Sequence, residues 1–371
     1  MKKRIPFVDL QIQYPLIKAE IEEKFSRIIE SARFVSGQHV REFEECFAAY
    51  VGCKHCIATV NGTVALQLSL MLLDIGPGDE VIVPVNSFIA TAEAVSLAGA
   101  TPIFVDINEE TYHLDLEDVA RKISRKTRAI VPVHLYGHCV GMDPILKLAK
   151  ANNLVVIEDA AQAHGAKYKG RHAGSFGRCA AFSFYPGKNL GAWGDAGAVT
   201  TNEDSLARKM RLFINHGSEK KYHHEILGGN YRMSEFQGAV LSSKLKHLDL
   251  WNQERRALAT LYSEYLDKKN FILPKVASQS EPVWHIYPIR CSNRDGLAKY
   301  LDGKDIDSII HYPIPIHLTE AYRHFGLKEG TFPVAEKVQS EILSLPLYPG
   351  LTDDEVRHVS QIVNRFYFSE Q

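Results

Sequence analysis

The chain has 371 residues, 45% of them hydrophobic, which is long enough for a large buried core and about two domains. Its 43 Lys and Arg against 44 Asp and Glu give a formal net charge of -1, so the sequence lacks the positive charge that binding to nucleic acid or an anionic membrane usually needs. No apolar run has the length of a signal peptide or a membrane span, and six sparse cysteines suit a reducing compartment, so we expect a cytoplasmic protein without membrane or nucleic-acid partners.

Strand and helix patterns alternate through the first two thirds of the chain. An extended arm and a helix from Pro15 to Ser31 come first, and helical patterns such as 64–73 and 142–152 then separate short runs rich in Val and Ile. These runs predict seven buried strands, at Cys56–Val60, Glu80–Val85, Thr101–Ile107, Ala129–Leu135, Leu154–Glu158, Cys179–Tyr185 and Gly197–Thr200. The alternation predicts an α/β fold in which helices cover both faces of a mostly parallel seven-stranded sheet.

The pattern changes beyond about residue 240. A long charged helix is expected around Lys244–Lys268, followed by candidate strands at Val283–Arg290 and Ile306–His311 and a terminal helix at Asp353–Phe366. We therefore expect a large domain at residues 1–250, which includes the N-terminal arm, and a smaller C-terminal α+β domain at residues 251–371.

A first candidate site lies where the first predicted strand gives way to a helix, at Asn61-Gly62-Thr63. Glycine lets the backbone approach an anion, and the free N–H groups of a helix start and a threonine hydroxyl could donate to a phosphate. An ordinary N-cap turn explains the same residues equally simply. Cys53 and Cys56 form a CxxC pair, but the second half of a zinc site is missing, so we expect no metal.

A second candidate is Asp159, which an apolar strand delivers to its carboxyl end, where ligands of open α/β sheets bind. Its negative charge could keep a pyridine nitrogen protonated, although a helix cap is an alternative. Glu158 points to the opposite face of the strand and is the weaker candidate. A third candidate is Lys188, which follows a strand and the turn Pro186-Gly187, and whose amine could form an imine unless it is a solvated loop lysine.

These three signals occur in the order that a pyridoxal-phosphate enzyme needs. Together with Pro6-Phe7-Val8-Asp9-Leu10, Gly76-Pro77-Gly78-Asp79-Glu80-Val81 and Ser344-Leu345-Pro346-Leu347, the chain resembles the fold-type-I aminotransferases of the DegT/DnrJ/EryC1/StrS family, the sugar aminotransferases. The resemblance runs across nearly the whole chain. It implies an aminotransferase in which residues 1–250 bind pyridoxal 5'-phosphate.

The resemblance also implies a role for each site residue. Lys188 would bind the cofactor as a Schiff base and move the proton, Asp159 would pair with the pyridine nitrogen, and Gln162 would contact the ring hydroxyl. Phe88 would stack on the ring, while Gly62, Thr63 and Ser183 would hold the phosphate. Asn230 would reach the phosphate of the neighbouring subunit, which implies a homodimer with shared active sites. Gly187 departs from the Ser or Thr common in the family, and the lysine at 188 favours transamination because dehydrating relatives carry histidine there.

For the substrate, the resemblance implies a nucleotide-linked keto hexose, with dTDP or UDP as the nucleotide. Its amino group would come from L-glutamate, which leaves as 2-oxoglutarate, through the pyridoxamine 5'-phosphate form of the cofactor. Arg232, His311 and Tyr312 would contact the sugar or diphosphate, although His311 could instead be a domain-interface histidine. The product would serve amino-sugar biosynthesis, such as that of lipopolysaccharide or another polysaccharide.

The amination position rests on two short stretches. Tyr222-His223-His224, within the polar segment 218–225, is similar to relatives that aminate carbon 3, although a solvated loop would look the same. Asn230-Tyr231-Arg232-Met233 is common among carbon-4 enzymes, and we favour carbon 3. Two alternatives stay open, a pyridoxal-phosphate enzyme that acts on a cyclitol or other non-nucleotide ketone, and a non-catalytic sensor of the same fold.

Overall fold

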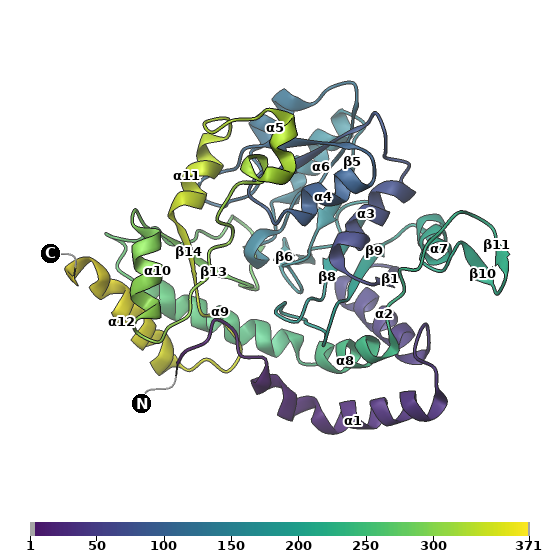
Figure 1. Ribbon diagram of the computed structural model, residues 1–371, viewed down its shortest axis with the longest axis horizontal. Coiled ribbons are helices and arrows are strands. Elements are labelled where there is room, and N and C mark those ends of the chain that lie inside the picture. Colours follow the sequence, from purple (N-terminus) through teal and green to yellow (C-terminus); the bar gives the residue numbers. More distant parts are fainter. Residues whose placement is uncertain (1–3, 370–371) are drawn as a thin grey trace.

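A computed structural model of the chain describes residues 4–369, and a seven-stranded sheet forms its centre (Figure 1). The strands are β1 (His55–Thr59), β2 (Glu80–Pro84), β3 (Thr101–Val105), β4 (Thr127–Ile130), β5 (Val155–Asp159), β8 (Cys179–Ser183) and β9 (Gly197–Thr201), in the order β1-β9-β8-β5-β4-β2-β3. β9 runs antiparallel to both of its neighbours, and the other adjacent pairs are parallel. The prediction of a mostly parallel seven-stranded sheet is therefore confirmed.

Helices cover both faces of this sheet because both faces are apolar. Successive side chains of a strand point to opposite faces, and here each set enters a different core. Ile57 and Val199 pack in the cluster that includes α3, whereas Ala58 and Phe182 pack in the cluster that includes α2 and α8. The helices of this part are α1 (Tyr14–Ser31), α2 (Gln38–Val51), α3 (Gly62–Leu72), α4 (Ala90–Leu97), α5 (Leu116–Lys122), α6 (Met142–Ala151), α7 (Asp204–Phe213) and α8 (Glu235–Leu245).

A second core lies in the C-terminal part of the chain. It is built from α9 (Leu248–Tyr265), α10 (Arg294–Asp302), α11 (Pro333–Glu341), α12 (Asp353–Ser369) and the antiparallel pair β13 (Tyr287–Arg290) and β14 (Ile342–Leu345). Ile5 of the N-terminal arm joins this core, and its N–H donates to the carbonyl of Asp305 at 2.8 Å. The expected division at residue 250 stays a prediction, since α9 crosses it with Leu248 in the α2 cluster and Leu258 in the second core.

Short elements connect these parts. They are the hairpin β10 (Ser218–Lys220) and β11 (His223–His224), the small sheet of β6 (Lys167–Tyr168), β7 (Arg171–His172) and β12 (Ser280–Glu281), and 3-10 turns at Gln11–Gln13, Leu135–Gly137, Ile316–Leu318 and Glu320–Phe325. Within residues 4–369, no helix combines the length and the apolar composition that crossing a bilayer requires.

The long helix expected around Lys244–Lys268 is α9 (Leu248–Tyr265), and α8 ends just before it at Leu245. α8 packs against α1 and α2, whereas α9 packs against α12. Two of the sequence predictions for local structure are wrong. The strand expected at 306–311 forms only isolated bridges, since Ile306 pairs with Ile5 on one side and Ile309 pairs with Ser344 on the other. The polar segment 218–225 is a hairpin rather than a loop, with Tyr222 in a left-handed turn conformation (φ 68°).

Candidate active site

A cavity of about 610 Å³ opens at the carboxyl ends of the parallel strands. β2, β5 and β8 all end beside it, and Phe7 of the arm and Arg255 and Leu347 of the C-terminal part complete its wall. Most of the predicted site residues line this cavity, namely Gly62, Thr63, Phe88, Asp159, Gln162, Ser183, Lys188, His311 and Tyr312. Segments far apart in the sequence therefore converge on one concave site, as is usual for ligand pockets of α/β sheets.

The start of α3 forms one edge of the cavity. The side chain of Asn61 accepts from the N–H of Val64 at 2.9 Å, so the turn is a capped helix start. Within residues 4–369, no hydrogen bond satisfies the N–H groups of Gly62 and Thr63. A Cβ at Gly62 would lie 2.6 Å from the Cβ of Ser183, so only glycine allows this close approach. The N-cap turn and the phosphate site, which the sequence left as alternatives, are thus compatible, because the same capped turn offers free donors that suit a phosphate.

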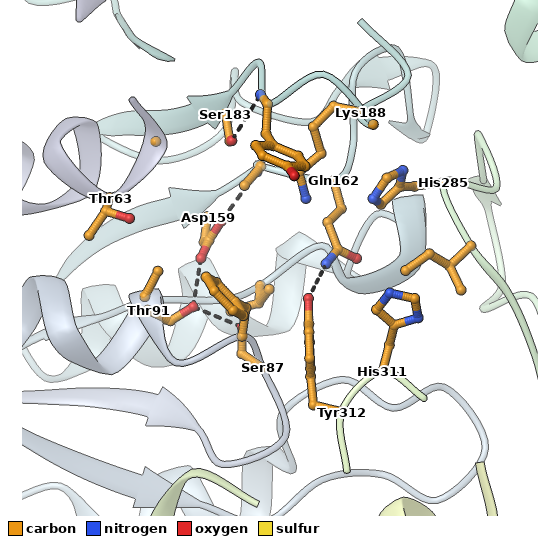
Figure 2. Close-up of a pocket in the computed structure, with 18 of the residues that line it drawn as sticks. Thr63, Ser87, Thr91, Asp159, Gln162, Ser183, Lys188, His285, His311 and Tyr312 are labelled. Carbon is orange, nitrogen blue, oxygen red and sulfur yellow. Dashed lines mark hydrogen bonds between the residues drawn. The ribbon is translucent and has the colours of Figure 1, made fainter. Parts of the chain in front are cut away.

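Asp159 ends β5 with 9% of its surface exposed, and donors hold both of its carboxylate oxygens. The hydroxyl of Thr91 donates to Oδ2 at 2.7 Å, and the N–H of Ala161 donates to Oδ1 at 3.2 Å. The hydroxyls of Ser87 and Thr91 lie 2.8 Å apart and extend this network, as Figure 2 shows. Turns rather than a helix follow Asp159, so the helix-cap alternative is wrong. Its carboxylate fits the protonated nitrogen of a pyridine ring.

Glu158 turns away from the cavity, as the alternation of side chains along β5 predicts. Its carboxylate is fully buried and accepts at 2.7 Å from each of three backbone N–H groups, those of Gly174, Phe176 and Gly177. It also accepts from Nε2 of His134 at 2.9 Å, since Nδ1 of that ring accepts from Val140. Glu158 is therefore a structural residue, and Asp159 is the carboxylate that β5 offers to the cavity.

Lys188 lies in the turn that follows β8. Its N–H donates to the carbonyl of Tyr185 at 2.8 Å, which closes the turn and directs the half-buried side chain to the cavity wall (Figure 2). Burial lowers the pKa of Lys188 to about 8, although the negative charge of Asp159 opposes the shift. The side chain thus lies in the cavity rather than in bulk solvent, and its amine is a better nucleophile near neutral pH than that of an ordinary lysine.

Two histidines lie close to Lys188. Nδ1 of His285 is 3.2 Å from Oδ1 of Asn189, and Nδ1 of His311 is 2.9 Å from the hydroxyl of Ser344. Burial and then the charge of Lys188 lower the pKa of His311 to about 4 and that of His285 well below its ordinary value. His311 both lines the cavity and contacts β14, so it matches its predicted position and also its alternative as an interface residue.

Polar and aromatic groups form another part of the cavity wall. Oε1 of Gln162 accepts from the N–H of Tyr136 at 2.6 Å, and Nε2 of Gln162 donates to the Tyr312 hydroxyl at 3.1 Å. Phe88 keeps 51% of its surface exposed, and its ring centroid lies 5.5 Å from that of Tyr312. An exposed flat face of this kind suits a planar aromatic ligand.

Asn230 and Arg232 do not lie at the cavity of their own chain. Arg232 lines a second cavity of about 560 Å³ and donates to Oδ1 of Asn215 at 2.9 Å and to Oδ1 of Asn230 at 3.0 Å. Asn230 itself is exposed. Within one chain, the structure therefore brings neither of them to Lys188.

Sequence reasoning missed several residues of the cavity wall, among them Thr91, His285 and Arg255. Arg255 occurs in the charged pattern of α9, and Thr91 lies in α4 without a motif around it. His285 follows Trp284 in a predicted strand, where a histidine carries no signal by itself. Only the fold places these three side chains beside Lys188 and Asp159.

Comparison with known proteins gives relatives along the whole chain. The model of the DegT/DnrJ/EryC1/StrS aminotransferase family matches residues 15–364. A dTDP-3-amino-3,4,6-trideoxy-alpha-D-glucose transaminase of Streptomyces venezuelae is 45% identical over 364 residues, which cover 98% of this chain and 96% of that protein. The erythromycin biosynthesis sensory transduction protein EryC1 of Saccharopolyspora erythraea is 44% identical over 356 residues, which cover 96% and 97% of the two chains.

Solved structures give the same result. The structure of S. venezuelae DesV in complex with a ketimine intermediate has a TM-score of 0.96 and 44% identity, and the match covers 100% of both chains. The structure of NtdA from Bacillus subtilis with bound cofactor PMP has a TM-score of 0.91 and 32% identity, and the match covers 100% of this chain and 86% of that one. The expected aminotransferase fold is therefore confirmed.

Proposed function

The chain belongs to the DegT/DnrJ/EryC1/StrS aminotransferase family, and from this membership we propose that it transfers an amino group from L-glutamate to carbon 3 of a keto hexose linked to dTDP or UDP. The chain is an aminotransferase, and its cofactor is pyridoxal 5'-phosphate, with pyridoxamine 5'-phosphate as the aminated form. The observation that carries the proposal is the convergence of Lys188, Asp159 and the Gly62 turn on one cavity.

The residues of the cavity fit this cofactor at each of its parts. Gly62 and Thr63 offer unused N–H groups to the phosphate, and the close approach of Gly62 to Ser183 brings a second hydroxyl to the same place. Asp159 would bind the pyridine nitrogen, and the exposed ring of Phe88 would cover the aromatic face. When bound, the cofactor supplies an electron sink for the carbon that loses or gains a proton.

The chain's own residues supply the proton transfers and the positioning. Nζ of Lys188, with its pKa near 8, can take a proton from a substrate carbon and return it without leaving the cavity. Thr91 keeps the Asp159 carboxylate oriented by donating to Oδ2. Tyr312 and Gln162, joined by their hydrogen bond, hold their part of the cavity wall in place, and burial keeps the nearby imidazole of His311 neutral.

The polar groups at the mouth of the cavity support a nucleotide-sugar substrate. His311 and Tyr312 line the cavity beside Lys188 and could contact the sugar. We propose that Asn230 and Arg232 act across a homodimer, because Asn230 is exposed and both lie away from the cavity of their own chain. In that arrangement Asn230 would reach the cofactor phosphate of a second copy, and Arg232 would meet a diphosphate.

Carbon 3 is favoured by the exposed hairpin β10–β11, which carries Tyr222, His223 and His224. The experiment is mass spectrometry of the reverse reaction, in which holoenzyme and 2-oxoglutarate are offered 3-amino and 4-amino nucleotide sugars in turn. Deamination of the 3-amino sugar alone is expected, whereas turnover of the 4-amino sugar alone would overturn the carbon-3 proposal.

The name of the EryC1 relative is an observation in favour of the sensor alternative. A non-catalytic chain would not need Lys188 and Asp159 at one cavity, so we retain the enzyme. A thermal-shift panel of nucleotide sugars against cyclitols tests the remaining alternative. Stabilisation by cyclitols but by no nucleotide sugar would indicate that the substrate is a non-nucleotide ketone.

A further inference from the structure

Arg255 of α9 is a buried guanidinium that lines the active-site cavity with only 3% of its surface exposed. Its Nη1 donates to three backbone carbonyls, those of Trp284 at 3.1 Å, His285 at 3.3 Å and Leu347 at 2.7 Å. Its Nε is buried and has no hydrogen-bond partner among the described residues. The carbonyls thus fix one side of the guanidinium and leave other donors unused.

No carboxylate of residues 4–369 forms an ion pair with Arg255, although the side chain is buried. Arg290 shows the contrast, since its side chain is 1% exposed and pairs with Glu109 and Glu341 at 2.7 Å each. Burial lowers the pKa of Arg255 to about 10, although the charge of Glu254 opposes the shift, and the guanidinium is still charged at neutral pH. A buried charge without a counter-ion is costly, so an anion that enters the cavity would relieve that cost.

Arg255 lies on the Lys188 side of the cavity. It binds the carbonyl of His285, while the ring of the same histidine binds Asn189, the residue after Lys188. The positive charges of Lys188 and Arg255 both act on that imidazole, which places it near both side chains. The phosphate turn at Gly62 and Ser183 is a separate part of the wall and has its own donors.

We propose that Arg255 binds a carboxylate of the amino donor, an inference that rests on the proposed function. An amino acid must bring its α-carbon to Nζ of Lys188, and its α-carboxylate is one bond from that carbon. The diphosphate of a nucleotide sugar is separated from a ring carbon by the sugar itself. A cation close to Lys188 therefore suits the carboxylate better, and a guanidinium with several free donors can bind it through two hydrogen bonds.

The test measures the binding of glutarate, a dicarboxylate that has no amino group and cannot react, to the pyridoxal-phosphate holoenzyme by calorimetry. Arg255→Gln removes the charge, Arg255→Lys keeps it, and Arg256→Gln changes the neighbouring arginine, which does not line the cavity. Thymidine diphosphate is titrated into the same proteins, and their melting temperatures report on folding. In a separate experiment, wild-type holoenzyme is mixed with L-glutamate and the absorbance of the cofactor is followed, which tests the proposed donor itself.

Arg255→Gln should weaken glutarate binding about tenfold or more, because a charge-assisted hydrogen-bonded pair is lost. Arg255→Lys should recover part of this affinity. Neither variant should change the affinity for thymidine diphosphate. Unchanged glutarate affinity, or a loss confined to thymidine diphosphate, would overturn the inference. If Arg255→Gln does not fold, the wild-type protein still provides a test. Neutral glutaramide should bind about tenfold more weakly than glutarate, and equal affinities would overturn the inference. Wild type that does not react with L-glutamate would instead refute the proposed donor.

Discussion

Thr91 donates a hydrogen bond of 2.7 Å to Oδ2 of Asp159 from the first turn of α4, and both residues are buried. The bond crosses from the segment after β2 to the end of β5, so it links the loop that carries Phe88 to the carboxylate of the cavity. The hydroxyl of Ser87 extends the link at 2.8 Å. A carboxylate that accepts such a bond is held in one orientation.

Replacing Thr91 by Val should therefore weaken pyridoxal phosphate binding without unfolding the protein, because Val keeps the shape of the side chain but leaves Oδ2 of Asp159 without its donor. We expect a loss of about 1–2 kcal/mol in cofactor affinity, roughly tenfold, measured by fluorescence titration of the apoprotein. The pH at which the absorption band of bound pyridoxal phosphate changes its wavelength should also shift. Thr91→Ser is the matched control, and a Ser variant as weak as the Val variant would mean that the methyl group matters rather than the hydroxyl.

The lowered pKa of Lys188 predicts how its reactivity depends on pH. Because burial disfavours the cation, Nζ should become reactive as the pH rises through about 8. Removing the charge of Asp159 in Asp159→Asn should move the midpoint to lower pH, since that charge favours the cation. The rate at which trinitrobenzenesulfonate modifies Lys188 in the apoprotein, followed by peptide mass spectrometry, measures the midpoint. Asp195→Asn is the control at the same cavity, and an equal shift there would contradict the assigned cause.

The turn at Gly62 predicts a steric effect. In Gly62→Ala the new Cβ would lie 2.6 Å from the Cβ of Ser183, and neither can move without displacing α3 or the end of β8. We expect the affinity for pyridoxal phosphate to fall about tenfold or more, by fluorescence titration, as overpacking distorts the phosphate turn. Gly187→Ser is the comparison, because a Cβ there meets only the Tyr185 ring at 3.9 Å and should be tolerated. Full affinity in Gly62→Ala would show that the turn is not the phosphate site.

The sequence predicts those features that depend on local periodicity. The seven strands alternate with helices, and Asp159 and Lys188 each follow an apolar strand, so their places at the sheet edge can be inferred before the fold is known. Arg255 could not be found in this way. Its position in the cavity depends on contacts between α9 and the carbonyls of Trp284 and Leu347, and the last of these is 92 residues away in the chain. The strand expected at 306–311 failed for a similar reason, since its two partners come from opposite ends of the chain.

Asn230 offers a test of the proposed shared site that no single chain can provide. If Asn230 of one copy serves the cavity of the other, then a mixed dimer of a Lys188→Ala subunit and an Asn230→Ala subunit has both changes in the same site. One site would carry both changes and the other would carry neither.

Mixing the two inactive variants under conditions that exchange subunits should then restore activity. Random pairing makes half of the dimers mixed and leaves one intact site in each, so recovery should approach about a quarter of wild-type activity. Lys188→Ala mixed with Asp159→Ala is the control, because both residues line the same cavity and each mixed dimer keeps a defect in both sites. Recovery in neither mixture, with subunit exchange verified by mass spectrometry, would place Asn230 outside a shared site.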